Sequence, residues 1–317
     1  MQAPFPAQDQ VSMDEIHDGL EKVFKISEYL KFPFTLNEVA DYFLPTTNMT
    51  GEQLRSILLD PNFADIPFQI KDGYLLTDAN EAAFREEKEK MSLAKLDSAS
   101  EFARVLRRMV PFIRTIAVTG SVAYGSADKW DDIDLFIITK RNRLWLTAFI
   151  TLAFVRLTKL LGLRAPHLSL FCLSYVHDED GFASESNRNR TNPLFARELL
   201  KAKPVAGADY YGRLLERNGW VEDIYSIPYT AKLKGLKAAK DGWRVERDPR
   251  LFSFLLGWTE SIAFQFLNRY LRMRAYLTNL KLRSQGQDLR VFEPKMSSVS
   301  CVYTSNFYEW LLRLWGK

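Results

Sequence analysis

The residues with the clearest chemical content lie between Thr119 and Thr139. An apolar stretch ends in Gly120-Ser121, and ten residues later Asp132 and Asp134 open a second apolar stretch. Because strand side chains alternate between two faces, Asp132 and Asp134 share one face. Carboxylates about 6 Å apart repel by roughly 3 kcal/mol at an effective dielectric constant of about 20, and a bound cation relieves that repulsion. Oxygen ligands without a nearby His or Cys suit Mg²⁺ or Mn²⁺.

The glycine end of the segment is suited to holding a phosphate. Gly120 lets the chain turn sharply and lets a phosphate approach the backbone. Ser121 offers a hydroxyl and a backbone N–H, and Val122 and Ala123 could begin a short helix whose amides face the same anion. A metal site beside a phosphate site indicates phosphoryl or nucleotidyl transfer. Taken singly, each of these residues is more often part of an ordinary turn or strand end, but their combination, order and flanking apolar strands favour the functional interpretation.

The Gly-Ser pair, the ten-residue gap and Asp-x-Asp resemble the signature of the polymerase-beta-type nucleotidyltransferase superfamily. The resemblance covers roughly residues 95–180 and is specific for the superfamily, not for a substrate. Two later segments, Asn192–Leu200 and Asn218–Val221, are similar to uncharacterised prokaryotic members. The resemblance implies a mixed sheet with flanking helices and transfer of NMP from an NTP, with loss of pyrophosphate.

By that resemblance, Gly120 and Ser121 bind the triphosphate, and Asp132 and Asp134 are the catalytic carboxylates that hold divalent metal ions. Superfamily members usually carry a third carboxylate on a later strand. The corresponding segment, 168–175, contains no acid, and its candidate positions hold Ser169, Cys172 and Ser174. Asp178, Glu179 and Asp180 follow it and look like an exposed turn, while Glu198 falls on an expected helix as a surface or capping residue.

The elements that precede this segment form a distinct pattern. We expect helices over 14–30, 35–43 and 50–59, the last two opened by capping boxes at Thr35 and Thr50. A hairpin over 68–76 turns at Asp72-Gly73. Helices followed by a hairpin are typical of a winged helix-turn-helix, which we assign to residues 1–80.

The remaining elements predict an α+β fold. Residues 81–225 form the expected nucleotidyltransferase domain, with helices over 80–110 and 143–163 and strands over 115–119, 132–139 and 167–175. Helices over 194–201 and 210–218 follow. Residues 226–317 form an expected helical C-terminal domain, with helices over 230–240 and 250–280.

Charge is unevenly distributed along the 317 residues, although the net charge is only +4. The first 80 residues carry five basic and 13 acidic side chains, so we do not expect this domain to bind DNA, which requires Lys and Arg. Residues 231–290 carry 13 basic and five acidic side chains. This excess is either a solvated helical face or a site for a triphosphate or a polyanionic acceptor.

The cellular setting follows from what the sequence contains. Two cysteines, Cys172 and Cys301, are too few for a disulfide framework or a structural zinc site, and no secretory signal is visible. The longest apolar run, 144–155, is shorter than a membrane span and predicts a buried helix, with an interfacial membrane contact as the alternative. We therefore expect a cytoplasmic protein without a membrane span.

Two functional hypotheses remain. The first is an Mg²⁺- or Mn²⁺-dependent nucleotidyltransferase that moves NMP from an NTP, with ATP preferred, to an acceptor that is a small molecule, a protein or an RNA. The second is a catalytically weak or inactive nucleotide-binding regulatory protein, and the missing third carboxylate separates the two. A DNA-binding regulator is a third option that the acidic N-terminal domain argues against.

Overall fold

The computed structural model describes residues 13–44, 49–60, 68–76, 81–160, 171–238 and 250–315. The chain divides into two compact units. The first comprises Met1–Lys88 and Trp220–Ala231, and the second comprises Glu89–Gly219 and Lys232–Lys317. One of the candidate third-carboxylate positions, Ser169, lies outside the described residues.

The first unit is built from short helices and a small sheet. Its elements are α1 (Met13–Leu30), β1 (Phe34–Thr35), α2 (Leu36–Phe43), α3 (Gly51–Leu58), β2 (Gln69–Lys71), β3 (Tyr74–Leu76), the start of α4 (Glu81–Met109), α10 (Trp220–Ile224) and the start of α11 (Ser226–Ala238). Both expected capping boxes are present, at Thr35 and Thr50. The sheet order is β1-β3-β2, and Asp72 and Gly73 make the expected turn with φ values of 51° and 82°.

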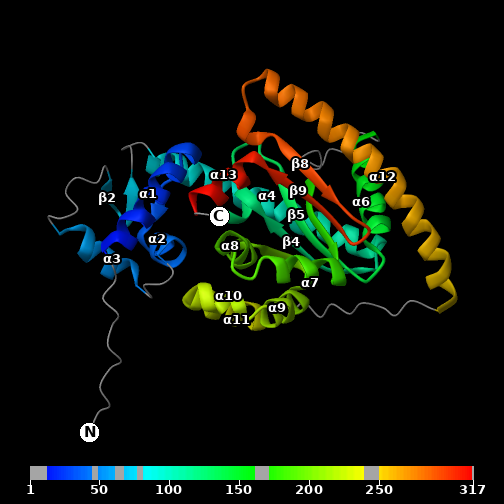
Figure 1. Ribbon diagram of the computed structural model, residues 1–317, viewed down its shortest axis with the longest axis horizontal. Coiled ribbons are helices and arrows are strands. Elements are labelled where there is room, and N and C mark those ends of the chain that lie inside the picture. Colours follow the sequence, from blue (N-terminus) through cyan, green and yellow to red (C-terminus); the bar gives the residue numbers. More distant parts are fainter. Residues whose placement is uncertain are drawn as a thin grey trace, which may run out of the picture. The chain divides into compact units, whose positions relative to one another are not determined.

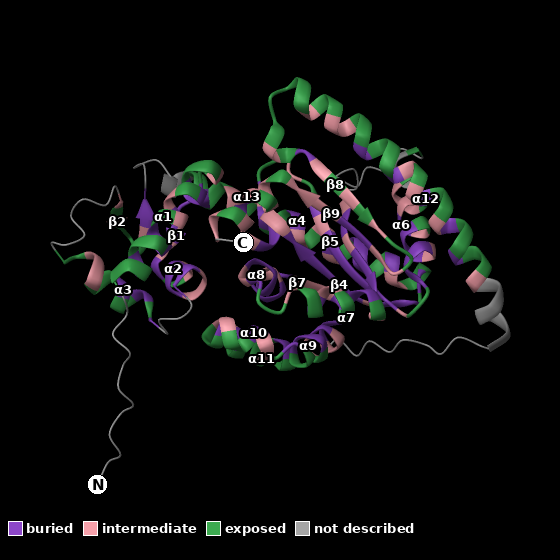
Figure 2. Cartoon of the chain, in the orientation of Figure 1, coloured by how far each residue is buried: buried purple, intermediate pink, exposed green. Residues whose placement is uncertain are grey.

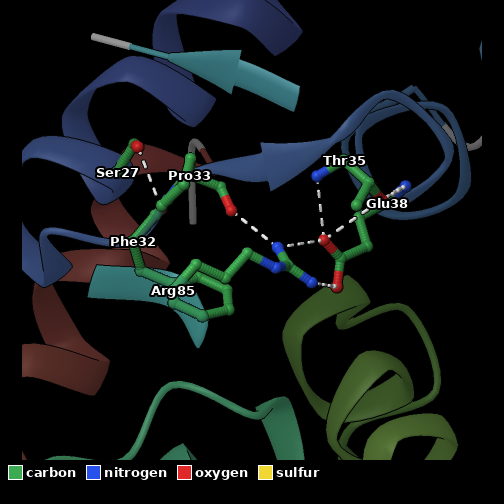
Figure 3. Close-up of polar contacts among 6 residues, drawn as sticks. All are labelled: Ser27, Phe32, Pro33, Thr35, Glu38 and Arg85. Atoms are coloured by element: carbon green, nitrogen blue, oxygen red, sulfur yellow. Dashed lines mark hydrogen bonds and ion pairs between the residues drawn. The ribbon is translucent and has the colours of Figure 1, made fainter. Parts of the chain in front are cut away.

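A buried arginine joins α4 to the rest of the first unit (Figure 3). Arg85 donates to the Pro33 carbonyl at 2.6 Å and to the Glu38 carboxylate at 2.9 Å. Its guanidinium lies 4.5 Å from the centre of the Phe32 ring. Glu38 is also the acidic member of the Thr35 capping box, so one carboxylate fixes both the start of α2 and the start of α4.

A mixed six-stranded sheet forms the centre of the second unit (Figure 1). Its elements are β4 (Ile113–Thr119), α5 (Gly120–Tyr124), β5 (Ile133–Thr139), α6 (Leu144–Leu160), β6 (Phe171–Asp178), α7 (Glu179–Arg188), α8 (Pro193–Lys201), β7 (Lys203–Ala206), α9 (Ala208–Arg217), α12 (Arg250–Ser284), η4 (Asp288–Arg290), β8 (Phe292–Met296), β9 (Ser300–Ser305) and α13 (Asn306–Leu314). The strand order is β7-β4-β5-β6-β9-β8. Only the β5–β6 pair is parallel among the described strands. The expected α+β fold with a mixed sheet is confirmed.

Helices cover both faces of this sheet. On one face, α4, α6 and α12 bury Leu106, Trp145 and Leu267 against the strands, in the continuous core coloured as buried in Figure 2. On the other face, the Phe136 ring of β5 lies 5.7 Å from Phe182 of α7 and 6.0 Å from Tyr211 of α9. The central strands β4 and β5 are buried on both sides, as their apolar sequences require, whereas the edge strand β8 exposes alternate residues.

The N-terminus of α6 is capped by a side chain from α12. Both carboxylate oxygens of Glu260 accept hydrogen bonds from the first amides of α6, one from Trp145 N at 2.6 Å and the other from Leu146 N at 2.8 Å. These amides have no partner within the helix, so the buried Glu260 satisfies them. Among the described residues, no helix has the length and apolar content needed to cross a bilayer.

Three strands of the second unit were not expected from the sequence. Residues 226–317, expected to be helical, also contain the β8–β9 hairpin, which extends the central sheet through β6. Residues 203–206 form β7 at the opposite edge. Both edge strands contain a proline, Pro204 in β7 and Pro294 in β8. Proline is tolerated at a sheet edge because one side of that strand needs no hydrogen-bond donor.

Candidate active site

The end of β4 brings Gly120 against Asp134. In the antiparallel β4–β5 ladder, Thr119 is paired with Asp134, so Gly120 begins α5 beside that carboxylate. Gly120 has a φ of 63°, and a Cβ atom built on it would collide with Asp134 Oδ2. Glycine is therefore required here by the close approach of the carboxylate as well as by the backbone conformation. Ser121 follows on α5 and is half-buried.

Asp134 is held by a serine from the neighbouring strand. β5 and β6 run parallel with Asp134 paired to Cys172, and a register irregularity follows before Phe136. Ser174 Oγ donates a hydrogen bond to Asp134 Oδ1. Burial raises the pKa of Asp134 to about 7, an effect that the Ser174 hydrogen bond opposes and that the charge of Asp132 reinforces.

Asp132 lies at the exposed end of β5, after a loop fixed by a buried lysine. Lys95 of α4 donates to the carbonyl of Asp128 at 2.5 Å and to that of Asp131 at 2.7 Å. Desolvation raises the pKa of Asp132, and the neighbouring charge of Asp131 adds to the rise. Lys95, Arg274 and Arg290 oppose it. Asp132 and Asp134 therefore lie close together, and the basic side chains of Lys95, Arg274 and Arg290 lie near them.

The position of Glu198 differs from the expectation of a surface or capping residue. Glu198 is half-buried on α8, and its carboxylate accepts a hydrogen bond from the Tyr124 hydroxyl at 2.8 Å. Burial raises the pKa of Glu198, while Arg197, the Tyr124 hydroxyl and the Gly120 backbone amide oppose that rise. Its charge also raises the pKa of Asp134, so Glu198 is an electrostatic neighbour of the Asp132–Asp134 pair.

The acids at the end of β6 and just after it cap a helix and form ion pairs. Asp178, expected in an exposed turn, is buried at the end of β6 and caps α7 by accepting from Gly181 N at 2.8 Å. Glu179 pairs with Arg114 at 2.9 Å and Asp180 with Arg141 at 3.0 Å. These contacts occupy the end of β6 away from Ser174. Across the described ranges, no group of three His, Cys, Asp or Glu side chains is arranged to hold a metal ion.

A comparison with protein families identifies the segment that carries this site. Residues 99–180 match the family model of the nucleotidyltransferase domain. The matched segment belongs to the polymerase-beta superfamily and runs from α4 through β6. It contains Gly120, Ser121, Asp132 and Asp134, so the resemblance drawn from these residues is confirmed for this segment. The match spans about a quarter of the chain. Neither the curated proteins nor the solved structures gave a match.

Several residues around Asp132 and Asp134 were not identified from the sequence. Lys95 is one of many charged residues on α4, and nothing local distinguishes it. Arg274 and Arg290 fall in the basic region 231–290, for which a triphosphate site was one of the two interpretations. Glu198 could not be assigned, because its proximity to Gly120 arises from the packing of α8, more than 70 residues along the chain.

Proposed function

We propose that this chain is a metal-dependent nucleotidyltransferase that transfers NMP from an NTP to an acceptor. The observation that carries the proposal is the placement of Gly120-Ser121 against Asp134 at the end of β4, inside the segment that matches the nucleotidyltransferase domain. In this proposal Gly120 and Ser121 bind the triphosphate, and Asp132 and Asp134 are the metal ligands.

The two aspartates fit a hard divalent cation. Mg²⁺ is commonly bound by one or two carboxylates, and substrate phosphates and water complete its coordination. Asp132 and Asp134 supply oxygen ligands. Burial is the main reason that the pKa of Asp134 is raised, and the charge of Asp132 adds to that rise, so the two carboxylates act on each other. A bound Mg²⁺ or Mn²⁺ would polarise the phosphoryl oxygens and neutralise developing charge. The preference for ATP remains an expectation, because no contact among the described residues distinguishes adenine from another base.

Basic side chains beside the aspartates support a triphosphate site. Arg274 and Arg290 act electrostatically on Asp132, and an Arg290 nitrogen lies 4.0 Å from an Asp131 oxygen. Guanidinium groups bind phosphate oxygens strongly and remain charged at all relevant pH values. We assign these two arginines to the β- and γ-phosphates. Glu198 fixes α5 by contacting Gly120 at one end of the helix and Tyr124 at the other.

A specific observation favours the second hypothesis, a nucleotide-binding protein with little or no transfer activity. The side chain that reaches Asp134 from β6 is Ser174, a hydroxyl donor where related enzymes usually have a carboxylate. A serine cannot take the proton of an attacking hydroxyl as a carboxylate does. This alternative predicts nucleotide binding without pyrophosphate release.

One experiment separates the two hypotheses. The full chain is incubated with Mg²⁺ or Mn²⁺, each α-³²P-labelled NTP and a cell extract, and label is sought on small molecules, protein and RNA. Label that disappears in Asp134→Asn and persists in Asp97→Asn, an exposed acid on α4, supports the transferase. Saturable NTP binding that needs Asp134, with no labelled product from any of the four nucleotides, supports the binding protein.

The first unit has the element order of a winged helix-turn-helix, three helices and a hairpin packed on a short strand. Its two capping boxes and the Asp72-Gly73 turn support that interpretation. The helix in the recognition position, α3, carries one basic residue, Arg55. Because DNA affinity depends largely on neutralising phosphates, we propose a protein-contact or substrate-positioning role. Filter binding of the full chain to mixed-sequence duplex DNA, expected to be negligible, tests this proposal.

A further inference from the structure

The long helix α12 carries an apolar stripe on the side that faces away from the core. Trp258, Ile262, Phe266, Met273, Tyr276 and Leu277 are between 56% and 67% exposed. At 3.6 residues per turn these positions fall within an arc of about 100°. The opposite side of α12, with Ala263, Leu267 and Leu271, is buried in the core. Packing in the core therefore explains why one face of α12 is apolar, but it does not explain the apolar stripe on the outer face.

The stripe continues onto the neighbouring helix α6. Phe149 of α6 is exposed, and its ring lies 6.2 Å from the ring of Phe266. Leu157 of α6 is exposed as well. Figure 2 shows α12 coloured largely as exposed along its described length. Contiguous exposed apolar surface on a folded protein commonly marks an interaction site.

The charges along α12 indicate what the stripe contacts. The exposed charged side chains that the structure describes on α12 are all basic. Arg274 acts on Asp132, and the others lie along the apolar stripe: Arg269, Arg272, Lys281 and Arg283. The sole acid, Glu260, is buried and is engaged by the amides of α6. Aromatic and aliphatic side chains flanked by Arg and Lys, without exposed carboxylates, match the composition of helices that lie in the surface of an anionic membrane.

We propose that the outer face of α12, with Phe149 and Leu157 of α6, binds the surface of a bilayer that contains anionic lipids. The apolar side chains enter the boundary between headgroups and acyl chains, and the flanking basic residues contact lipid phosphates. A second copy of the chain fits the surface less well. A symmetric α12–α12 contact would bring the basic residues of one copy against those of the other, with no exposed carboxylate on the helix to offset them. Nucleic acid fits less well too, because Ile262, Met273 and Leu277 neither stack on bases nor bind phosphate. This proposal is independent of the nucleotidyltransferase activity.

The test is co-sedimentation of the full chain with phosphatidylcholine vesicles and with vesicles of phosphatidylcholine mixed with phosphatidylserine. We expect binding to the mixed vesicles that weakens with added salt. Ile262→Gln/Leu277→Gln should abolish it, and Leu93→Gln, an equally exposed leucine on α4, should leave it unchanged. Each basic residue near an anionic surface strengthens binding by about fivefold, so Lys281→Ala/Arg283→Ala should weaken the partition coefficient about 25-fold.

The double substitutions lie at exposed positions, and circular dichroism confirms that each variant is folded before it is scored. Equal binding to both kinds of vesicle, or wild-type binding by folded Ile262→Gln/Leu277→Gln, would overturn the proposal. So would a lipid-free dimer, measured by light scattering, that Ile262→Gln/Leu277→Gln converts to monomer and Leu93→Gln does not, because the stripe would then be an interface between copies.

Discussion

Gly120 begins α5 and Gly125 follows its last residue, and comparing the two glycines isolates the role of the Gly120–Asp134 contact. Gly120 and Gly125 both have left-handed backbones, with φ values of 63° and 80°. An alanine in that conformation costs about 1 kcal/mol at either position. At Gly125 the nearest atom to an added Cβ is a Glu89 methylene 3.6 Å away, which is an ordinary contact. At Gly120 the added Cβ collides with Asp134 Oδ2.

The collision forces Asp134 away from Ser174. Losing that charged hydrogen bond costs about 2 kcal/mol, so Gly120→Ala should lower the free energy of unfolding by about 3 kcal/mol and Gly125→Ala by about 1 kcal/mol. Urea denaturation of the two variants measures the difference. Isothermal titration with Mg²⁺ and an NTP should show binding lost in Gly120→Ala and retained in Gly125→Ala. Equal destabilisation of the two variants, with equal nucleotide binding, would refute the close approach of Gly120 and Asp134.

Two further predictions concern stability. Burial lowers the pKa of His177 to about 3, so between that value and the unfolded value of about 6.5 the unfolded chain binds more protons and stability falls as the pH falls. From pH 7 to pH 5, His177→Leu should therefore lose about 2 kcal/mol less stability than the wild type. The control Phe182→Leu, beside the same ring, should lose as much stability between these pH values as the wild type does. A wild-type pH dependence in His177→Leu would contradict this prediction. Glu260→Ala leaves two α6 amides without their acceptor and should cost about 3 kcal/mol in urea denaturation, and a cost under about 1 kcal/mol would mean that water replaces the carboxylate.

Features encoded within a few residues were predictable. The capping boxes at Thr35 and Thr50 act over three residues, so the starts of α2 and α3 follow directly from the sequence. The Asp72-Gly73 turn was predictable because both of its residues tolerate positive φ. The placement of the aspartates next to Gly120 was also predictable in outline, because β4 and β5 are consecutive strands and pair with Thr119 opposite Asp134.

Features that depend on distant pairing were not predictable. Strand β9 adds to the central sheet by pairing Val302 with Tyr175, residues separated by more than 120 positions. The strands β7 and β8 are short and each contains a proline, which ordinarily argues against a strand. Their place at the two edges of the sheet removes that objection, but the edge position is a property of the assembled sheet and cannot be read from either segment.

The same limit governs the choice between an enzyme and a binding protein. The β6 side chain that reaches Asp134 is Ser174 and not a third carboxylate, and this observation alone favours the inactive protein. The fold places another acid near Asp134, Glu198 of α8, which reaches the site from a helix between β6 and β7. Glu198 is committed to the Gly120 amide and the Tyr124 hydroxyl, so it orders the phosphate-binding turn and does not complete a group of three metal ligands. If nucleotide binding draws the Gly120 amide to a phosphate, Glu198 loses that partner and its carboxylate is released beside Asp134. Transfer activity that is lost in Glu198→Gln while NTP binding persists would show that this acid serves the reaction, and unchanged activity would confine it to holding the turn.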